Sequence, residues 1–180
     1  MSGTSTAELP AGYRAALRAL LRFSIVMAVV GLLTGISFQE SARKLPFSAA
    51  GAGLHLEAVI NLALVHGHVF TMGVLMPLAL AGALLMARRA GGREVGPRAL
   101  CWLLWGYLPA AAATSALQLV KGYHFLLAAR HGATDLAQVD AAFLGGQPVI
   151  RFVLYGAVHG VLGVCLVVFL VALWRSLPRD

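Results

Sequence analysis

Charged residues are scarce in this sequence, and their scarcity excludes most classes of soluble protein. Only 12% of the 180 residues are Asp, Glu, Lys or Arg, whereas 59% are hydrophobic. A soluble domain carries about 25% charged residues. The composition therefore indicates an integral membrane protein, and the length suits one small helical bundle.

Acidic residues are fewer than basic ones, with seven Asp and Glu against fourteen Lys and Arg. The basic residues cluster at the ends of apolar runs, which is typical of cytoplasmic loops facing lipid headgroups and not of nucleic-acid binding. The sequence also lacks a nucleophile–base pair, a phosphate-binding loop and a soluble domain, so it favours a role without catalysis. Both cysteines, Cys101 and Cys165, lie in apolar runs and are expected to be small buried hydrophobes.

Four apolar runs each approach the roughly 20 residues needed to cross a ~30 Å hydrocarbon core. We therefore expect an all-α fold, an integral membrane antiparallel four-helix bundle of residues 14–180 that follows a disordered tail of residues 1–13. The predicted spans are residues 17–38, 56–86, 99–120 and 149–174.

The connections between the spans carry their own signals. Residues 41–55 are expected to form the first loop, and the third helix to continue past Lys121 toward His131. The GGQP sequence at residues 145–148 is expected to break the chain before the last span. Pro77, inside the second span, is expected to kink the helix and to free a backbone carbonyl.

The distribution of Lys and Arg predicts the topology. One end of the bundle would carry the larger set, Arg14, Arg18, Arg22, Arg88, Arg89, Arg93, Arg98, Arg175 and Arg179. The other end would carry Arg43, Lys44, Lys121, Arg130 and Arg151. The richer end should be cytoplasmic, which predicts a multi-pass protein of the bacterial inner (plasma) membrane with both termini inside.

Three histidines lie deep in the apolar runs, where an ionisable side chain is costly and marks a candidate functional site. His66 and His68 fall ten and twelve residues past Leu56, which places them about 15–18 Å deep. His159 falls eleven residues past Pro148, about 16 Å deep. All three are expected at one level near the middle of the membrane.

Residues two apart on a helix point about 200° away from each other, so His66 and His68 are expected to serve different partners. The side of His68 also carries Asn61, Thr71 and Met72. Because that side is the more polar one, it is predicted to face inward. The side of His66 carries Val69, Phe70 and Gly73.

Three glycines, Gly156, Gly160 and Gly163, surround His159. Small residues there leave room for a flat macrocycle, and they also permit close helix packing. Three interpretations of the buried histidines stay open. They bond across helices as neutral imidazoles, they bind haem or copper, or they line a proton or ion path.

The sequence HGHVFTMG at residues 66–73 resembles a motif of a bacterial domain-of-unknown-function family of small four-helix membrane proteins, whose second span carries a similar H-x-H-x4-G pattern. The likeness extends over most of residues 20–175. Three further segments are similar to parts of that family's first, third and fourth spans. They are GISFQESARK at residues 35–44, LVKGYH at residues 119–124 and GAVHGVLG at residues 156–163. The resemblance implies the four-helix fold and carries no established activity.

The H-x-H pattern is also distantly similar to haem–copper oxidase subunit I and to haem- and copper-containing nitric-oxide-response membrane proteins. In the oxidases a buried H-x-H on one helix serves two haems on opposite sides. This chain lacks the tyrosine-linked histidine and the paired copper histidines of those enzymes, so the analogy implies a haem site and not oxidase activity.

The leading hypothesis is a b-type haem-binding membrane protein in electron transfer or in redox or gas sensing. Its haem iron would be held by His68 and His159, with His66 beside them or at a second site. The expected partners are the lipid bilayer, a redox partner or respiratory-complex subunit, and a second copy of the chain.

Two alternatives remain open. One is copper handling or respiratory-complex assembly, since the imidazoles of His66, His68 and His159 and the thioethers of Met72 and Met76 suit copper. An entry site for copper could then be formed by His55, Glu57, His124 and His131. The other alternative is a cofactor-free membrane scaffold subunit.

Overall fold

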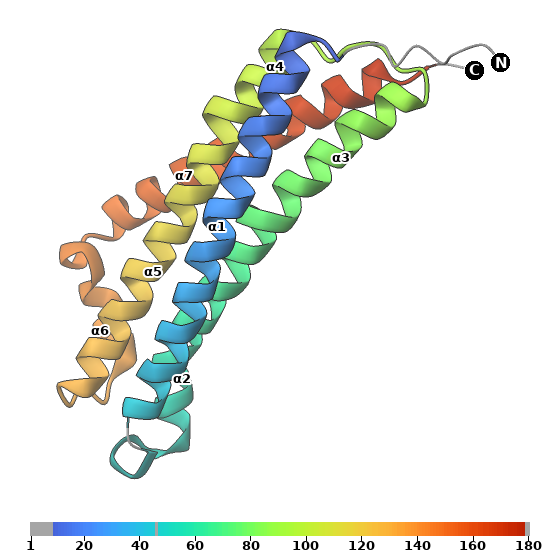
Figure 1. The fold of residues 1–180 in the computed structure, drawn as a ribbon. Coiled ribbons are helices and arrows are strands. Elements are labelled where there is room, and N and C mark those ends of the chain that lie inside the picture. Colours follow the sequence, from blue (N-terminus) through green and yellow to red (C-terminus); the bar gives the residue numbers. More distant parts are fainter. Residues whose placement is uncertain (1–8, 46, 179–180) are drawn as a thin grey trace.

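The computed structural model describes residues 9–45 and 47–178, and these residues form a bundle of helices without a strand (Figure 1). The elements are α1 (Ala11–Lys44), α2 (Phe47–His68), η1 (Val69–Leu75), α3 (Met76–Arg89), α4 (Pro97–Cys101), η2 (Trp102–Tyr107), α5 (Leu108–Arg130), α6 (Leu136–Ala142), η3 (Phe143–Gly146) and α7 (Pro148–Ser176). η1 and η2 are π-helical, and η3 is a 3₁₀ turn.

Four rods make up the bundle: α1, the continuous α2–η1–α3, the continuous α4–η2–α5, and α7. Each is long and apolar enough to cross a membrane, over Ala11–Lys44, His55–Arg89, Pro97–Arg130 and Pro148–Ser176. The start of α1 and the end of α7 lie at the same end of the bundle (Figure 1). The predicted all-α four-helix architecture is confirmed.

Two predicted boundaries are wrong, because both segments are helical. α1 begins at Ala11, and Tyr13 is buried where its hydroxyl accepts a bond from the Val95 amide at 2.7 Å, so the tail does not extend to residue 13. The expected first loop is also mostly helix, since α1 runs to Lys44 and α2 begins at Phe47. This segment is rich in alanine, which is the best helix former.

Two other expectations agree with the structure, the extension of the third helix and the break before the last span. α5 continues to Arg130. Gly145 and Gly146 break the chain with φ of 74° and 72°, a conformation that glycine adopts without strain. α7 then begins at Pro148, where the missing amide costs no helical hydrogen bond.

The second residue after each π-helical segment is a proline. Because proline has no amide hydrogen, one carbonyl in each segment loses its helical donor. At the end of η1 the Met76 amide bonds the Thr71 carbonyl, five residues back. Pro77 is next in this register and has no amide, so the Met72 carbonyl is free. The Tyr107 hydroxyl donates to that carbonyl at 2.9 Å. The predicted freeing of a backbone carbonyl by Pro77 is therefore confirmed.

Pro109 stands in the same relation to η2. The Leu108 amide bonds the Leu103 carbonyl, again five residues back, and Pro109 cannot supply the next donor. The two prolines thus mark wide turns at corresponding places in the two central rods.

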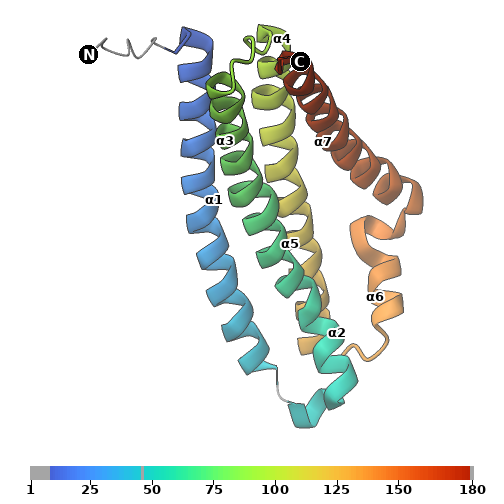
Figure 2. The ribbon, with the colours of Figure 1, turned by 90° about the vertical axis from the view of Figure 1, so that its right-hand side faces the viewer.

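Packing differs between the two ends of the bundle. The largest hydrophobic cluster lies toward the end that holds the termini and draws buried residues from all four rods, among them Leu20, Leu84, Leu103 and Phe169. A second cluster toward the opposite end, with Val59, Leu62 and Phe125, includes no residue of α7. Figure 2 shows α7 leaning away from the other rods toward that end.

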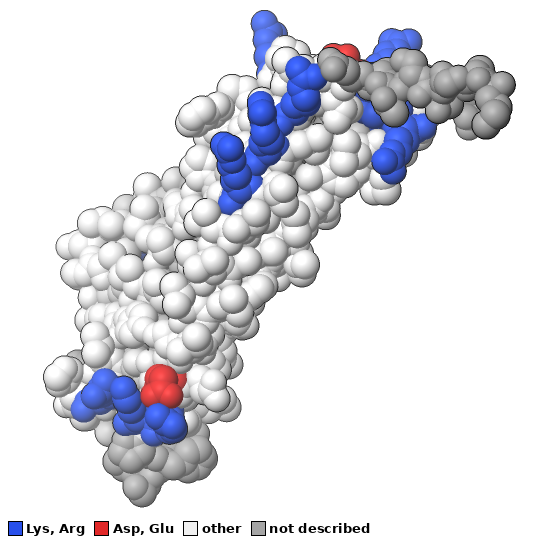
Figure 3. All heavy atoms as spheres, in the orientation of Figure 1, with Lys and Arg blue, Asp and Glu red and all other residues white. Residues whose placement is uncertain are grey.

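Charges gather at the two ends of the molecule, and the middle of the face seen in Figure 3 is uncharged. A row of exposed arginines, Arg14, Arg18 and Arg22, follows α1. Glu40 pairs with Arg43 at 2.9 Å. This distribution is the one expected for a rod that crosses a bilayer.

An ion-pair network joins three elements at the end away from the termini. Asp140 of α6 lies 2.8 Å from the Lys121 ammonium of α5 and 3.2 Å from the Arg151 guanidinium of α7. The hydrogen bond from Lys121 is the main reason why the pKa of Asp140 lies below its ordinary value of 3.8, and the Arg151 charge adds to it. The network holds the short α6 helix between the two rods.

Candidate functional site

His66 is packed against α1. Its Nδ1 donates to the Gly31 carbonyl at 2.9 Å, and its ring meets Phe70 edge-on with centroids 4.8 Å apart. A methyl group at Gly35 would lie 2.9 Å from the His66 ring, and one at Gly31 would lie 2.5 Å from Phe70. The two glycines therefore form a notch in α1 that these rings fill.

His68 and His159 share a different arrangement. His68 Nδ1 donates to the Leu64 carbonyl at 2.8 Å, and His159 Nδ1 donates to the Tyr155 carbonyl at 2.9 Å. Each acceptor is one turn back on the same helix, so each Nδ1 carries the proton. A histidine whose Nδ1 donates to a backbone carbonyl has Nε2 left to ligate a metal.

The predicted inward side of α2 needs correction. Val69 and Gly73, on the side of His66, are buried, whereas Thr71, on the side of His68, is exposed. The polarity of Thr71 misled the sequence argument, because its hydroxyl faces outward. His66 faces a neighbouring helix, and His68 is half-buried at the flank of the packed face.

Contacts along α5 show the depth of His68. The Tyr107 hydroxyl bonds the Met72 carbonyl. Further along, a methyl group at Gly122 would lie 2.7 Å from Leu62. These two contacts match Met72 with Tyr107 and Leu62 with Gly122. His68 lies four-tenths of the way along α2 from Met72 to Leu62. It is therefore level with the point of α5 that lies four-tenths of the way from Tyr107 to Gly122.

The same helix shows the depth of His159. A methyl group at Gly106 would lie 2.2 Å from Cys165 Sγ. The Tyr155 hydroxyl donates to the Leu117 carbonyl at 3.4 Å. These two contacts match Cys165 with Gly106 and Tyr155 with Leu117. His159 lies six-tenths of the way along α7 from Cys165 to Tyr155. It is therefore level with the point that lies six-tenths of the way from Gly106 to Leu117.

Both histidines are therefore level with roughly residue 113 of α5, given the regular rise of the helices. α5 packs against both α2 and α7 at this depth, and it separates the two rods in Figure 2. The hydroxyl of Thr114, at the same level, is fully buried and has no hydrogen-bond partner. The shared depth predicted for His68 and His159 thus agrees with the helix contacts, although no ring contact joins the two.

The sides of the helices that bear these histidines converge further along. Met72 and Met76 follow His68 by four and eight residues, and Leu166 follows His159 by seven, so each lies on the same side of its helix as the histidine. All three belong to the largest hydrophobic cluster. The helix sides that bear His68 and His159 therefore both reach the largest hydrophobic cluster, although α5 stands between the two rods at the level of the rings.

Open space flanks both rings. Methyl groups built at Gly67, Gly156, Gly160 and Gly163 would meet no atom within 4 Å. His159 itself is exposed and stacks on Tyr155, with centroids 6.2 Å apart. The glycines leave space beside the two imidazoles, and imidazole nitrogen is a donor that holds haem iron.

The residues considered for copper are dispersed. Within residues 9–45 and 47–178, no three His, Cys, Asp or Glu side chains come close enough to hold a metal ion together. His124 donates through Nε2 to the Val139 carbonyl at 3.0 Å and so fixes α6 to α5. His131 is exposed in the turn after α5. Cys165 is buried as expected, whereas Cys101 is exposed.

Several structural residues were not found by sequence reasoning. The notch of Gly31 and Gly35 carries a readable signal, the GxxxG spacing, that sequence analysis assigned only to Gly156 and Gly160. The role of Tyr107 has no such signal, because its acceptor lies on another rod. No family model, no curated protein and no solved structure matches the chain.

Proposed function

We propose that this protein binds haem b within the membrane and serves electron transfer or redox or gas sensing. His68 and His159 are the proposed axial ligands. The observation that carries the proposal is their common hydrogen bond, in which each Nδ1 donates to the carbonyl one turn back at matching depth and Nε2 is left for another partner. A ligand set fixed in this way needs little reorganisation when it binds a metal.

The surrounding residues support this role by their size. Gly67 beside His68 and Gly156 and Gly160 beside His159 leave the helix surfaces flat. The Tyr155 ring stacks against His159 and restricts its rotation. A bound haem would supply one-electron chemistry or a site for a diatomic gas, and the residues named here would bind it, orient it and exclude water.

His66 has a separate role in this proposal. It packs into α1 and sets the rotation of the helix that also carries His68, through its bond to Gly31. This arrangement favours the interpretation of His66 as a helix-bonding histidine. It does not by itself assign that role to His68 or His159.

The test is an absorbance spectrum of the protein purified from haem-replete cells, reduced minus oxidised, with the haem content measured beside it. We expect one Soret-absorbing haem per site, and we expect His68→Ala and His159→Ala each to lose it or to give a shifted five-coordinate form. His66→Ala is the matched control and should keep the absorbance while lowering thermal stability.

Other outcomes separate the alternatives. Copper by metal analysis without a Soret band would favour copper handling. A protein free of haem and copper that also folds normally with both His68 and His159 replaced would favour a scaffold subunit. Retention of haem in both single variants together with its loss in His66→Ala would contradict the assigned ligands.

We also propose an orientation in the bacterial inner membrane, with the arginine-rich end that holds both termini in the cytoplasm. The proposal rests on the excess of arginine at that end, where Arg88, Arg89, Arg93 and Arg98 lie in or beside the short connection between α3 and α4. Reporter fusions after Arg93 should read cytoplasmic, and fusions near Ala133 should read external.

A further inference from the structure

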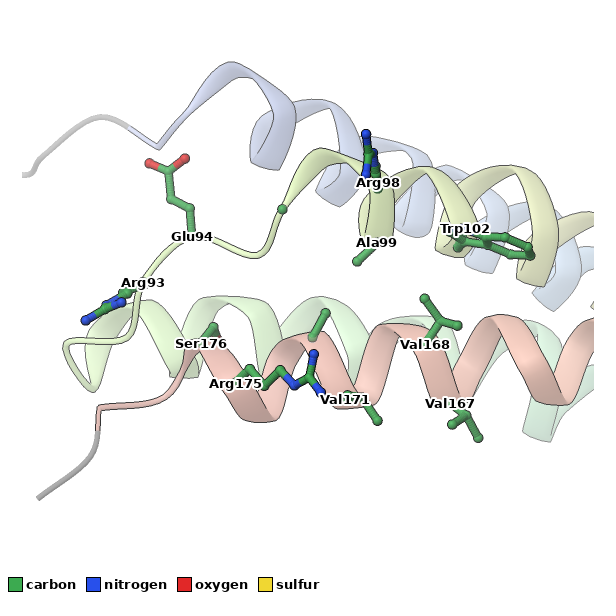
Figure 4. Close-up of a pocket in the computed structure, with 12 residues that line it drawn as sticks. Arg93, Glu94, Arg98, Ala99, Trp102, Val167, Val168, Val171, Arg175 and Ser176 are labelled. Carbon is green, nitrogen blue, oxygen red and sulfur yellow. The ribbon is translucent and has the colours of Figure 1, made fainter.

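A groove runs between η2 and α7 at the end of the bundle that holds the termini. Its outer part has a volume of about 570 Å³ and is lined by the basic connection before α4 and by one side of α7 (Figure 4). A second hollow of about 420 Å³ continues it, and the two share Arg98 and Trp102. Cavities of about 300–1,000 Å³ are the size that binds small ligands.

The walls of the groove are apolar. In Figure 4, Trp102 and Val168 point toward each other across it, and Val171 lies further along α7. The floor is closed where Gly106 allows Cys165 to approach, since a methyl group at Gly106 would lie 2.2 Å from the sulfur. The groove is therefore a surface hollow that opens toward the surroundings of the bundle and not into its core.

The outer end of the groove is basic. Arg93 and Arg175 both line it, and they also line a small adjoining hollow of about 250 Å³. Both are exposed, and in the described part of the chain neither guanidinium forms an ion pair. Glu94 stands at the same end but points away from α7 (Figure 4).

A backbone bond fixes the connection that carries Arg93 to the end of α7, next to Arg175. The Arg93 amide donates to the Ser176 carbonyl at 2.7 Å, which fixes the connection to the end of α7. A methyl group at Gly92 would lie 2.6 Å from the Ala87 carbonyl oxygen and 3.0 Å from that of Ser176. Only glycine permits this approach, so the basic end of the groove is preformed.

The length of the groove matches one leaflet. From Arg175 to Val161 the helix rises about 21 Å, compared with about 20–22 Å for one leaflet including its headgroup region. We infer that the groove binds an anionic phospholipid, with its phosphate at Arg93 and Arg175 and one acyl chain along Trp102 and α7. An apolar helix of a partner would leave the two guanidinium groups without a counter-charge, and a phospholipid supplies one.

The test uses Trp102 as the reporter. Trp105 and Trp174 are 80% and 78% exposed, so Trp105→Phe with Trp174→Phe should leave a folded protein with one tryptophan. This protein is placed in nanodiscs of fixed phosphatidylglycerol and phosphatidylcholine content, with bromine on the chains of one lipid or of the other. Because the composition is constant, the difference in quenching measures which lipid lies at Trp102.

We expect stronger quenching by brominated phosphatidylglycerol. Arg93→Gln and Arg175→Gln should each lower the preference about five-fold. The matched control is Arg18→Gln with Arg22→Gln, which removes exposed charge from α1 and should leave the preference unchanged. Unchanged thermal unfolding in all variants shows that folding is intact.

Equal quenching by the two lipids would overturn the inference, as would an equal loss in the α1 control. Quenching by neither lipid would mean that another occupant, such as a second copy of the chain, covers the groove. Loss of the preference on addition of inorganic phosphate would assign the arginines to a free anion and would equally overturn a lipid site. Haem content is measured in the same samples, and its loss would not affect this result.

Discussion

The two halves of the bundle hold α7 in different ways. Near the termini α7 contributes Cys165 and Phe169 to a core shared by all four rods. Toward the other end the exposed fractions of Val149 and Phe152 are 68% and 81%, and an ion-pair network at Asp140 is the main link to α5 and α6. Close packing fixes one half, and charge and open surface characterise the other, which also carries His159.

The largest difference in stability between the two halves should appear when a methyl group is added to one glycine in each half. Gly106→Ala should cost about 3 kcal/mol or more, the upper end for overpacking, because the new atom overlaps Cys165 and the packed half has no space to accommodate it. Gly156→Ala, in the open half, should leave stability unchanged or slightly raised, because alanine is the better helix former. Thermal unfolding of both proteins in one detergent checks this, and equal losses would contradict the comparison.

Removing the hydroxyl group of one tyrosine in each half should have an intermediate effect on stability. Tyr107→Phe leaves the Met72 carbonyl without a donor in the packed half and should cost about 1–3 kcal/mol. Tyr155→Phe removes a bond of 3.4 Å in the open half and should cost about 0.5 kcal/mol or less. The two unfolding curves, measured side by side, should differ in this order, and the reverse order would show that α7 is held more firmly at its outer half.

The smallest effect should come from Asp140→Asn, at most about 1 kcal/mol, because the carboxylate is partly exposed. Its lowered pKa sets the sign of the pH dependence. The network stabilises the fold above pH 3.8, and this contribution is lost as the pH falls through the lowered pKa of the folded state. Unfolding measured between neutral and acid pH should show a loss at low pH that Asp140→Asn lacks. Glu40→Gln, which breaks an exposed pair, is the control and should retain the acid loss.

Much of the fold was predictable, because apolar runs and prolines act locally. The four rods follow from hydropathy, and a freed carbonyl follows from Pro77, although its position at Met72 depends on the π-helical register of η1. The first turns of α2 were mistaken for a loop, because their glycines weaken the helical signal while their alanines sustain the helix. A local count of residue types cannot decide such a balance.

The candidate site was predictable in depth but not in direction. The level of His68 and His159 depends on residue counts along straight helices. The partner of His66 depends on Gly31 of another rod, and no local pattern contains that information. The ion pairs of Asp140 with Lys121 and Arg151 were missed for the same reason, because α6 brings them together only in the folded chain.

The wide turn at η1 has a consequence for the periodicity of the buried face. Buried residues of α2 and α3 recur at alternating steps of three and four, the usual period of an α-helix. Through η1 they recur at four, four and four, at Val65, Val69, Gly73 and Pro77. An unbroken α-helix with that spacing would rotate its buried face steadily around the axis, and the π turn takes up the extra residue instead. Because η1 absorbs this extra residue, the buried face of α3 stays in line with that of α2 along the whole rod.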